Sequence, residues 1–235
     1  MERWIEHYNS SQEILLVGEG DFSFSACLAR AFGSATNMVA TSLESQGSLL
    51  AKHWSSWSHL EELRRMGCLV LHGVDVHKMD LHPVLKWREF DVIIFNFPHA
   101  GHYSWLREKD YELIQMHREL LKGFFESARC MLSYGGEIHV TTRDDYPYHR
   151  WNVEGLAEEA GLILSDKVIF NKSDYPGYQN KRGGDIKGNK TFRLRNCYTF
   201  IFSVPDGSTS DQMSLCSEIT SSGSYYMNMS RPFAV

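Results

Sequence analysis

The segment "EILLVGEGDFSFSACLARAFG", residues 13–33, constrains the fold more than any other part of the chain. Its apolar run at residues 14–17 is short and continuous, which is typical of a strand buried on both faces of a sheet. Gly18 and Gly20 interrupt the run, and Ser23 is a good N-cap for the apolar residues that follow at helical spacing. The segment therefore predicts a strand, a glycine turn and a helix, which open a parallel α/β sheet.

The same alternation continues along the chain. Further strands are predicted at residues 38–44, 68–76, 90–97, 137–142, 162–170 and 197–204. Amphipathic stripes predict helices over residues 50–63, 113–131 and 153–160. Strands that alternate with helices indicate an α/β fold, with helices on both faces of one sheet of about seven strands. No helical stripe separates the last two strands, so we expect a hairpin there and one antiparallel edge strand in a mostly parallel sheet.

Composition bounds the class of protein. The chain has 235 residues, of which 43% are hydrophobic, and we assign residues 1–205 to a single domain with one sizeable core. Residues 206–235 are rich in serine and are expected to form a disordered tail. No stretch reaches the roughly 20 apolar residues of a membrane helix, and the N-terminus carries no apolar signal segment. We therefore expect a soluble, intracellular protein.

Charge and cysteine content narrow the class further. A net charge of −5 and a pI near 6.1 argue against a protein that coats nucleic acid through bulk charge, although they are compatible with a local basic patch. The five cysteines are widely spaced and form no C-x-x-C pair. They are expected to be reduced thiols rather than a disulfide framework or a zinc site.

The ends of the predicted strands carry residues suited to a nucleoside ligand. Ligands of doubly wound sheets bind beyond the carboxyl ends of the strands, so these residues are expected to converge. The two glycines allow close backbone approach, Glu44 is placed to accept hydrogen bonds from ribose hydroxyls, and Asp75 is placed to accept one from an adenine amine. The candidate cofactor-binding residues are Gly18, Glu19, Gly20, Asp21, Phe22, Glu44 and Asp75.

Two cofactors compete for this set, a dinucleotide and S-adenosylmethionine. The dinucleotide fingerprint is G-x-G-x-x-G, whereas this chain reads G-E-G-D-F-S, with Ser23 in place of the third glycine. The acid at the third strand end and the hairpin at the sheet edge favour S-adenosylmethionine. A simpler interpretation is that Gly18 and Gly20 only form a turn, but a turn would not also require both acids.

A second cluster, "NFPHAGH", follows the fourth predicted strand. It is similar to the (Asp/Asn)-Pro-Pro-aromatic motif of methyltransferases that act on planar nitrogens of bases, in which oxygens accept N–H bonds, a ring packs on the base and proline fixes the turn. An Asn-x-Pro turn with a surface histidine is the alternative, and a metal site from His99 and His102 lacks further ligands at a known spacing. The predicted acceptor-binding residues are Asn96, Phe97, Pro98 and His99.

The segment between the last two predicted strands is basic, with interleaved aromatic residues. Residues 175–195 of this segment carry several lysines and arginines against Asp185 alone. Such a composition suits a surface for single-stranded RNA, and a solvated hairpin loop is the alternative. The candidate RNA-binding residues are Tyr178, Lys181, Arg182, Lys187, Lys190 and Arg193.

Four segments together resemble one protein family: "LLVGEGDFSFSACLARAF", "GVDV", "FDVIIFNFPHAG" and "YPGYQNKR". It is the Rossmann-like domain of eukaryotic large-subunit ribosomal RNA uridine-N3 methyltransferases and their plant relatives, and the resemblance covers residues 12–204. The resemblance implies a class I methyltransferase fold, S-adenosylmethionine as methyl donor and a uridine of ribosomal RNA as acceptor. The family often has Asp-Ala-Thr after the third strand. This chain has Asp75-Val76-His77 there, which retains the acid and changes the loop.

We therefore expect an enzyme that methylates uridine N3 in ribosomal RNA. Because N3 must lose its proton before it attacks, a histidine is suited to act as general base, and His99 is assigned as that base or its orienter. Asn96 is expected to fix the uracil edge and Asp21 to lie near the methyl group. Phe97 or Phe22 is expected to pack on the base.

Other functions stay open on the sequence alone. They are a non-catalytic domain that binds S-adenosylmethionine or RNA, a methyltransferase acting on a small molecule, and a dinucleotide-dependent enzyme. Ribosomal RNA is the expected partner, with no membrane and no metal involved. We expect a monomer in the nucleolus, the nucleus or the cytoplasm.

Overall fold

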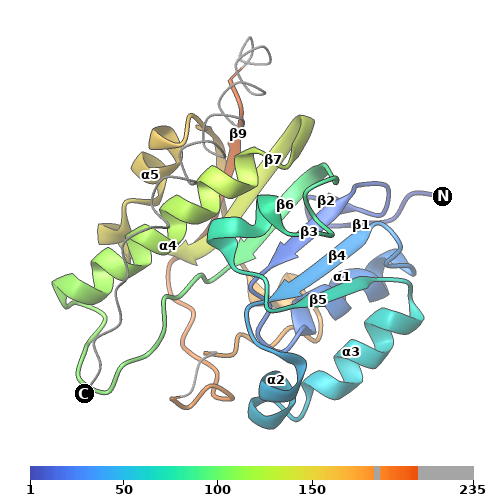
Figure 1. Cartoon of the computed structure of the whole chain (residues 1–235), viewed down its shortest axis with the longest axis horizontal. Helices are drawn as coiled ribbons and strands as arrows, with labels where there is room; N and C mark the ends of the chain where they lie inside the picture. The colour runs from blue at the N-terminus through green and yellow to red at the C-terminus, as the bar shows by residue number, and fades with distance from the viewer. Residues whose placement is uncertain (183–185, 206–235) are drawn as a thin grey trace, which may run out of the picture.

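The computed structural model describes residues 1–182 and 186–205, and a single large sheet organises them (Figure 1). Its strands are β3 (Ile14–Val17), β4 (Met38–Ser42), β5 (Leu69–His72), β6 (Phe90–Asn96), β7 (Leu132–Arg143), β8 (Ile163–Ile169) and β9 (Cys197–Ser203). They lie in the order β5-β4-β3-β6-β7-β9-β8. The predicted α/β fold with a seven-stranded sheet is confirmed.

The strand order reverses between β3 and β6, which pair in parallel with Ile14 opposite Val92 and Val17 opposite Phe95. The chain runs outward from β3 through β4 to β5, then returns to the other side of β3 and continues through β6 to β7. Such a switch point leaves a crevice beyond the carboxyl ends of the two central strands. Ligands of doubly wound sheets bind in this crevice.

The predicted hairpin is present as β8 and β9, with one difference in detail. The strand β9 is antiparallel to both β7 and β8, so the antiparallel strand lies one position in from the edge and β8 forms the edge itself. The strand β7 also begins earlier than expected. Gly135, which has a φ of 74°, and Gly136 lie inside β7, ahead of residue 137, where the sequence predicts that the strand begins.

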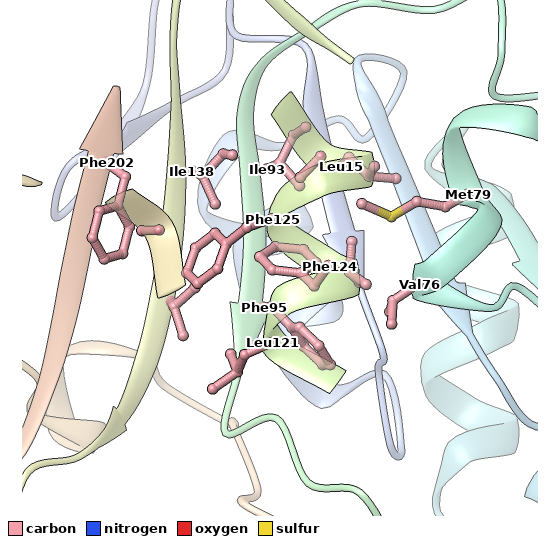
Figure 2. Packing of buried hydrophobic residues seen from close by; sticks show 14 of the residues in the cluster. Leu15, Val76, Met79, Ile93, Phe95, Leu121, Phe124, Phe125, Ile138 and Phe202 are labelled. Atoms are coloured by element: carbon pink, nitrogen blue, oxygen red, sulfur yellow. The ribbon is translucent and has the colours of Figure 1, made fainter. Parts of the chain in front are cut away.

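Alternate residues of the central strands point to opposite faces of the sheet and pack into two separate hydrophobic cores, as expected of a sheet covered on both faces. Leu15 and Phe95 face the helices α4 (Tyr111–Arg129) and α5 (Val153–Glu159) and the 3-10 helix η1 (Val76–Leu81). Figure 2 shows Leu121, Phe124 and Phe125 of α4 packed against this face. On the opposite face, Ile14 and Ile94 pack with helices α1 (Ser23–Phe32) and α3 (Ser56–Arg65).

The stripe at residues 50–63 predicts one helix, and the structure has two. Helix α2 (Gln46–Lys52) ends before α3 because the backbone of His53 leaves the helical region, with φ −128° and ψ 83°. His53 is buried, and its carbonyl accepts a hydrogen bond from the Ser56 hydroxyl at 2.5 Å. The break turns Trp54 and Trp57 outward, where both are more than half exposed.

The remaining regular elements are short. They are the strands β1 (Trp4–Ile5) and β2 (Tyr8–Asn9) and the 3-10 helices η2 (Tyr148–Trp151) and η3 (Lys172–Asp174). None of the helices in the described part of the chain is both long and apolar enough to cross a bilayer. The tail predicted at residues 206–235 lies outside the described residues.

Cysteines are reduced at three of the four positions that the structure describes. Cys27, Cys68 and Cys197 are free and buried, and burial raises the pKa of the Cys27 thiol to about 11. The expectation of reduced thiols therefore holds for these three buried cysteines.

Candidate active site

The carboxyl ends of β3, β4 and β6 and the loop after β5 line one cavity of about 560 Å³, called here the strand-end cavity. A cavity of this size can hold a small-molecule cofactor. Six of the seven predicted cofactor-binding residues line it, together with one predicted acceptor residue from β6: Gly18, Glu19, Gly20, Asp21, Glu44, Asp75 and Asn96. The sequence prediction that these strand ends converge is therefore confirmed.

The turn after β3 depends on Gly18. Its φ is 66°, a left-handed conformation, and a Cβ at this position would lie 2.5 Å from the ring of Phe95. A larger residue is therefore excluded both by backbone conformation and by the neighbouring strand. Gly20 is different, because a Cβ there would meet only the Cβ of Lys181 at 4.0 Å.

The two acids of this turn are held differently. Glu19 is buried, its Oε2 accepts a hydrogen bond from the backbone N–H of Ser25 at 3.2 Å, and burial raises its pKa to about 7. Asp21 is also buried, and its Oδ1 accepts from the backbone N–H of Ser23 at 3.0 Å. The other oxygen, Oδ2, is buried without a hydrogen-bond partner among the described residues. A buried carboxylate oxygen in a cavity wall is suited to a cationic ligand group.

The carboxylates of the acids after β4 and β5 are held by hydrogen bonds from residues close to them in the sequence. Glu44 accepts hydrogen bonds from the Lys52 ammonium at 2.6 Å and from the Ser48 hydroxyl, so helix α2 fixes its orientation. Asp75 caps η1 by accepting from the backbone N–H of His77 at 3.0 Å. Although partial burial acts in the other direction, hydrogen bonds from His77 lower the pKa of Asp75. Both carboxylates are therefore pre-positioned acceptors at the cavity wall.

The expectation that the Phe22 ring packs on the base is wrong. Its ring is fully buried in the core on the α1 side of the sheet, 5.7 Å from the ring of His72, and it lines neither of the two cavities described here. The cause is its backbone, which is left-handed with a φ of 60° where α1 begins. This turn directs the ring into the core, and a buried ring cannot pack on a base.

A second, smaller cavity adjoins the first and is called here the aromatic cavity. It is lined by Phe97, Pro98, His99, His102, Glu108, Thr142, Arg143, Tyr148, Trp151, Arg182 and Phe192. Phe97, His99, His102 and Arg182 also line the strand-end cavity. The two cavities therefore share a wall, and a molecule in one lies next to a molecule in the other.

Phe97 stands at this shared wall in a strained conformation. Its φ is 51°, which is uncommon for a bulky residue, and its backbone N–H donates to the carbonyl of Thr141 on the neighbouring strand at 2.7 Å. Its ring meets those of Phe170 and Phe192 edge-on, at 5.5 and 5.1 Å between centroids. On another wall, the guanidinium of Arg143 lies over the ring of Tyr148 at 4.2 Å. The cavity thus offers flat apolar faces with cations at their rim.

Behind the shared wall, Glu108 lies between two histidines. Nε2 of His99 is 3.1 Å from Glu108, and Nε2 of His117, which is fully buried on α4, is 3.6 Å from it. Although burial acts in the other direction, the contacts with His117 and His99 hold the pKa of Glu108 well below its usual range. Burial lowers the pKa of His117.

These three groups converge in the manner of a metal site, but the ring tautomers argue against one. Nδ1 of His99 accepts the backbone N–H of Gly101 at 3.2 Å, and Nδ1 of His117 accepts that of Ala100 at 3.0 Å. Each imidazole therefore carries its proton on Nε2, the atom that faces Glu108. A metal ligated through Nε2 needs the opposite tautomer, so we interpret the cluster as a hydrogen-bonded pair of His99 and Glu108 with the ring of His117 beside it.

His102 has a different environment. Its ring is stacked on that of His99, with centroids 4.1 Å apart and an interplanar angle of 15°. Its Nε2 accepts a hydrogen bond from Nε of Arg182 at 3.0 Å, while its Nδ1 is buried without a partner among the described residues. Burial, followed by the neighbouring His99 and Arg182, lowers the pKa of His102 to about 4.

The structure divides the predicted RNA-binding set in two. Tyr178, Lys181 and Arg182 line the strand-end cavity, and the ring of Tyr178 packs on Phe24 at 5.3 Å instead of facing solvent. The backbone N–H of the next residue, Gln179, donates to the Ser23 hydroxyl at 2.8 Å, which ties this segment to the start of α1. The remaining members, Lys187, Lys190 and Arg193, are exposed.

Several lining residues were missed by the sequence analysis. They are Glu108, Thr142, Arg143, Tyr148 and Trp151, whereas Phe192 belongs to the basic and aromatic segment that the sequence indicated. The missed residues come from the loop after β6, the end of β7 and the segment with η2, and none belongs to a local motif. Only the position of Thr142 and Arg143 at the carboxyl end of a predicted strand could have indicated them.

Comparison with protein families identifies the chain. Residues 15–182 match the model of the BMT5-like family, described as "rRNA (uridine-N3-)-methyltransferase BTM5-like". The chain belongs to this family. The match covers the turn after β3, the acids after β4 and β5, and the cluster after β6, so the resemblance drawn from the sequence is confirmed.

Curated relatives of this BMT5-like protein differ in length. Heavy metal-associated isoprenylated plant protein 41 of Arabidopsis thaliana is 48% identical over 201 residues, which are 86% of this chain and 39% of that protein. An uncharacterized protein of the same plant is 46% identical over 86% of this chain and 97% of its own length. The 25S rRNA (uridine(2634)-N(3))-methyltransferase of Saccharomyces cerevisiae is 22% identical over 83% of this chain and 74% of its own length.

S-adenosylmethionine is the cofactor of this methyltransferase family, and the strand-end cavity fits it. Gly18 leaves room for close approach, Asp21 offers a buried acceptor without a partner among the described residues, and Glu44 is an anchored acceptor at the wall. These groups suit an adenosine joined to a cationic sulfonium.

Proposed function

We propose that this protein transfers a methyl group from S-adenosylmethionine to N3 of a uridine in ribosomal RNA. The observation that carries the proposal is the wall shared by the two cavities, formed by Phe97, His99, His102 and Arg182. An enzyme that joins a small cofactor to a planar base needs two such adjoining sites. The name of the yeast relative supports uridine N3 as the atom methylated.

The strand-end cavity would hold the cofactor, which supplies an electrophilic methyl group on its sulfonium. The turn from Gly18 to Asp21 would receive the cationic part, Glu44 the ribose hydroxyls and Asp75 the adenine amine. We place the buried acids of the turn closest to the positive charge, since an anion in a low-dielectric wall stabilises a cation beside it.

The aromatic cavity would hold the uracil. A base in a stem must be unstacked before it can enter, and the rings of Phe97 and Phe192 offer faces and edges against which a flat base can pack. Asn96 lines the adjoining strand-end cavity, and both atoms of its amide are buried without a hydrogen-bond partner among the described residues. Its role in fixing the uracil edge therefore does not depend on which way the amide is turned.

The reaction itself requires little covalent chemistry from the protein. The uracil N3 loses its proton, its lone pair forms the new N–C bond, and the C–S bond breaks with its electron pair remaining on sulfur. The side chains have to orient the base in line with the methyl group, exclude water and make loss of the N3 proton easier.

Ribosomal RNA is the proposed partner, bound by the exposed part of the basic loop. Lys187, Lys190 and Arg193 are exposed and lie on the same connection that brings Arg182 to the shared wall. Such an arrangement would let phosphate contacts position the strand while the cavity receives one base. We propose that the protein acts as a monomer, in the nucleolus, the nucleus or the cytoplasm.

The proposal is tested with unmodified large-subunit ribosomal RNA transcribed in vitro, labelled S-adenosylmethionine and the purified full chain. Digestion to nucleosides and mass spectrometry should reveal N3-methyluridine. The Asn96→Ala variant should bind S-adenosylhomocysteine as the wild type does and form at least tenfold less product. Label in another nucleoside, or binding of both cofactor and RNA without turnover, would contradict the proposed reaction. The second result would favour a non-catalytic binding domain.

A further inference from the structure

We infer that His102 is a catalytic hydrogen-bond donor, whose Nδ1–H binds a carbonyl oxygen next to N3 and stabilises the charge that appears there as N3 ionises. Arg182 and His99 are positioning residues for this ring. The inference rests on the proposed function, and it assigns to His102 a role that differs from general-base catalysis by His99.

The tautomer of His102 follows from its contact with Arg182. A guanidinium can only donate, so Nε2 of His102, at 3.0 Å from Nε of Arg182, must carry a lone pair. A neutral ring with a lone pair on Nε2 has its proton on Nδ1. That N–H is buried and has no partner among the described residues, and the residue lines both cavities. A buried donor without a partner is costly unless a ligand satisfies it.

Charged and titratable neighbours keep this ring neutral. Arg182 faces it from the β8–β9 connection, His99 is stacked on it at 4.1 Å, and His117 and Glu108 lie behind His99. Burial together with His99, Arg182 and His117 lowers the pKa of His102, with Glu108 acting in the opposite direction, and the result is about 4. The donor is therefore present throughout the physiological pH range.

The two nitrogens of His99 are both engaged within the protein. Nε2–H faces Glu108 at 3.1 Å, and Nδ1 accepts from the backbone of Gly101 at 3.2 Å. Neither atom is free to take a proton from a base in the cavity. His99 instead presents the face of its ring to His102, and Glu108 holds His99 in that orientation.

A donor at a carbonyl oxygen has a direct effect on uracil. When N3 loses its proton, the negative charge spreads over N3 and the two flanking carbonyl oxygens. A fixed N–H directed at one of these oxygens from the cavity wall stabilises the ionised form more than the neutral one. The proton can then be lost to solvent, with no side chain acting as its base.

The test compares His102→Ala with His102→Gln, because glutamine keeps an N–H donor and lacks a basic nitrogen. Initial rates are measured from pH 6 to 10 on transcribed large-subunit ribosomal RNA that contains either uridine or the more acidic 5-fluorouridine. We expect a loss of about 100-fold for alanine at pH 7 and of less than about tenfold for glutamine. The alanine deficit should shrink at least about tenfold with 5-fluorouridine or high pH, because N3 then ionises without help.

Outcomes that overturn the inference are distinct. If glutamine is as inactive as alanine, His102 acts as a base, and if both match the wild type, it has no catalytic role. A deficit that is equal at every pH and for both nucleosides indicates a structural role. His82→Gln is the matched control, since His82 lines neither cavity, and every variant should bind S-adenosylhomocysteine equally. If the wild type forms no N3-methyluridine, the proposed function fails instead.

A second measurement does not depend on activity. Nitrogen-15 NMR of the histidine rings reports which nitrogen carries the proton. His102 should remain neutral and protonated on Nδ1 from pH 5 to 8, and Arg182→Leu should mix the two tautomers. A wild-type ring that is protonated on Nε2, or cationic at pH 6, would contradict the inference whatever the RNA result.

Discussion

The two cavities at the sheet edge are built in different ways. The strand-end cavity is formed largely by residues that directly follow neighbouring parallel strands, within short segments after β3, β4, β5 and β6. The aromatic cavity draws on the loop after β6, the end of β7, the segment with η2 and the β8–β9 connection. A local motif can encode the first, because parallel strands bring their ends together. The second exists only after distant loops have packed.

Their electrostatics differ as well. In the strand-end cavity, Glu19 is buried with no cationic partner in the part of the chain that the structure describes, and burial raises its pKa to about 7. At the aromatic cavity, Glu108 faces two histidines that hold its pKa below its usual range, despite its burial. The comparison indicates that Glu19 is placed to pair with an incoming cation, whereas Glu108 is already paired within the protein.

The largest expected effect tests the local construction of the strand-end cavity. Gly18→Val should destabilise the fold by about 2–4 kcal/mol and abolish S-adenosylhomocysteine binding, because the position has φ 66° and faces the Phe95 ring. Gly20→Ala is the matched control, and it should lower the free energy of unfolding by less than about 1 kcal/mol. Thermal unfolding and calorimetric titration measure both. Equal effects of the two changes would show that the turn does not depend on Gly18.

The next effect tests the unpaired acid. Glu19 has its pKa raised from 4.5 to about 7, so the protonated form is favoured in the folded state, and stability is lost as pH rises through this window. Glu19→Gln should therefore gain on the order of 2–3 kcal/mol relative to wild type between pH 4.5 and 7, with no further gain above pH 7. Urea unfolding at several pH values measures this. A difference that does not change with pH would mean that Glu19 titrates normally.

A smaller effect tests the aromatic cavity. Phe192→Ala removes a ring that packs edge-on against Phe97 at 5.1 Å. We expect kcat/KM for RNA methylation to fall about 10- to 100-fold, since base–aromatic stacking contributes about 1–3 kcal/mol. The affinity for S-adenosylhomocysteine should not change. Tyr134→Ala, at a ring that is 89% exposed on β7, is the control. A parallel loss of cofactor binding would show that the two cavities are not separable.

The smallest effect concerns the exposed cations. Replacing Lys187, Lys190 and Arg193 by alanine should weaken RNA binding severalfold and flatten its salt dependence, because each lost phosphate contact lowers the slope by about 0.7. Filter binding or fluorescence anisotropy at several salt concentrations measures this. The effect is small because these side chains are exposed to solvent.

A matched control for these cations lies toward the other end of the sheet. Lys86 and Arg88 precede β6 and Lys122 lies in α4, and all three are exposed. Replacing them by alanine changes the net charge by the same amount and should leave the salt slope unchanged. If both triple variants lose affinity equally, bulk charge and not the loop binds the RNA.

The fold was predictable because its signals are local. Continuous apolar runs and helical stripes follow from the burial of each element, so strands and helices could be placed before their packing was known. The misplaced boundaries arise where tertiary packing decides the backbone. The helix at residues 50–63 breaks at His53, which is buried and non-helical, and Gly135 continues a strand. Both are tertiary choices that override propensity.

The candidate site was predictable only in part. Glu44, Asp75 and Asn96 follow strands and could be placed together by topology alone. The burial of Phe22 could not be predicted, because its left-handed backbone turns the ring into the core. The hydrogen bond between Arg182 and His102 could not be predicted either, because it joins residues 80 positions apart.

The sequence by itself determined the order of strands and helices, the glycine turn after β3 and the family to which the chain belongs. Only the tertiary structure decided which hydrogen-bond partners His99 and His102 have, and therefore which role we propose for each. Both lie in one short segment, and nothing in their spacing distinguishes them. His99 is held by Glu108 and a backbone amide, whereas His102 is held by Arg182. A histidine's tautomer is set by its hydrogen-bond partners, and those partners come from distant parts of the chain.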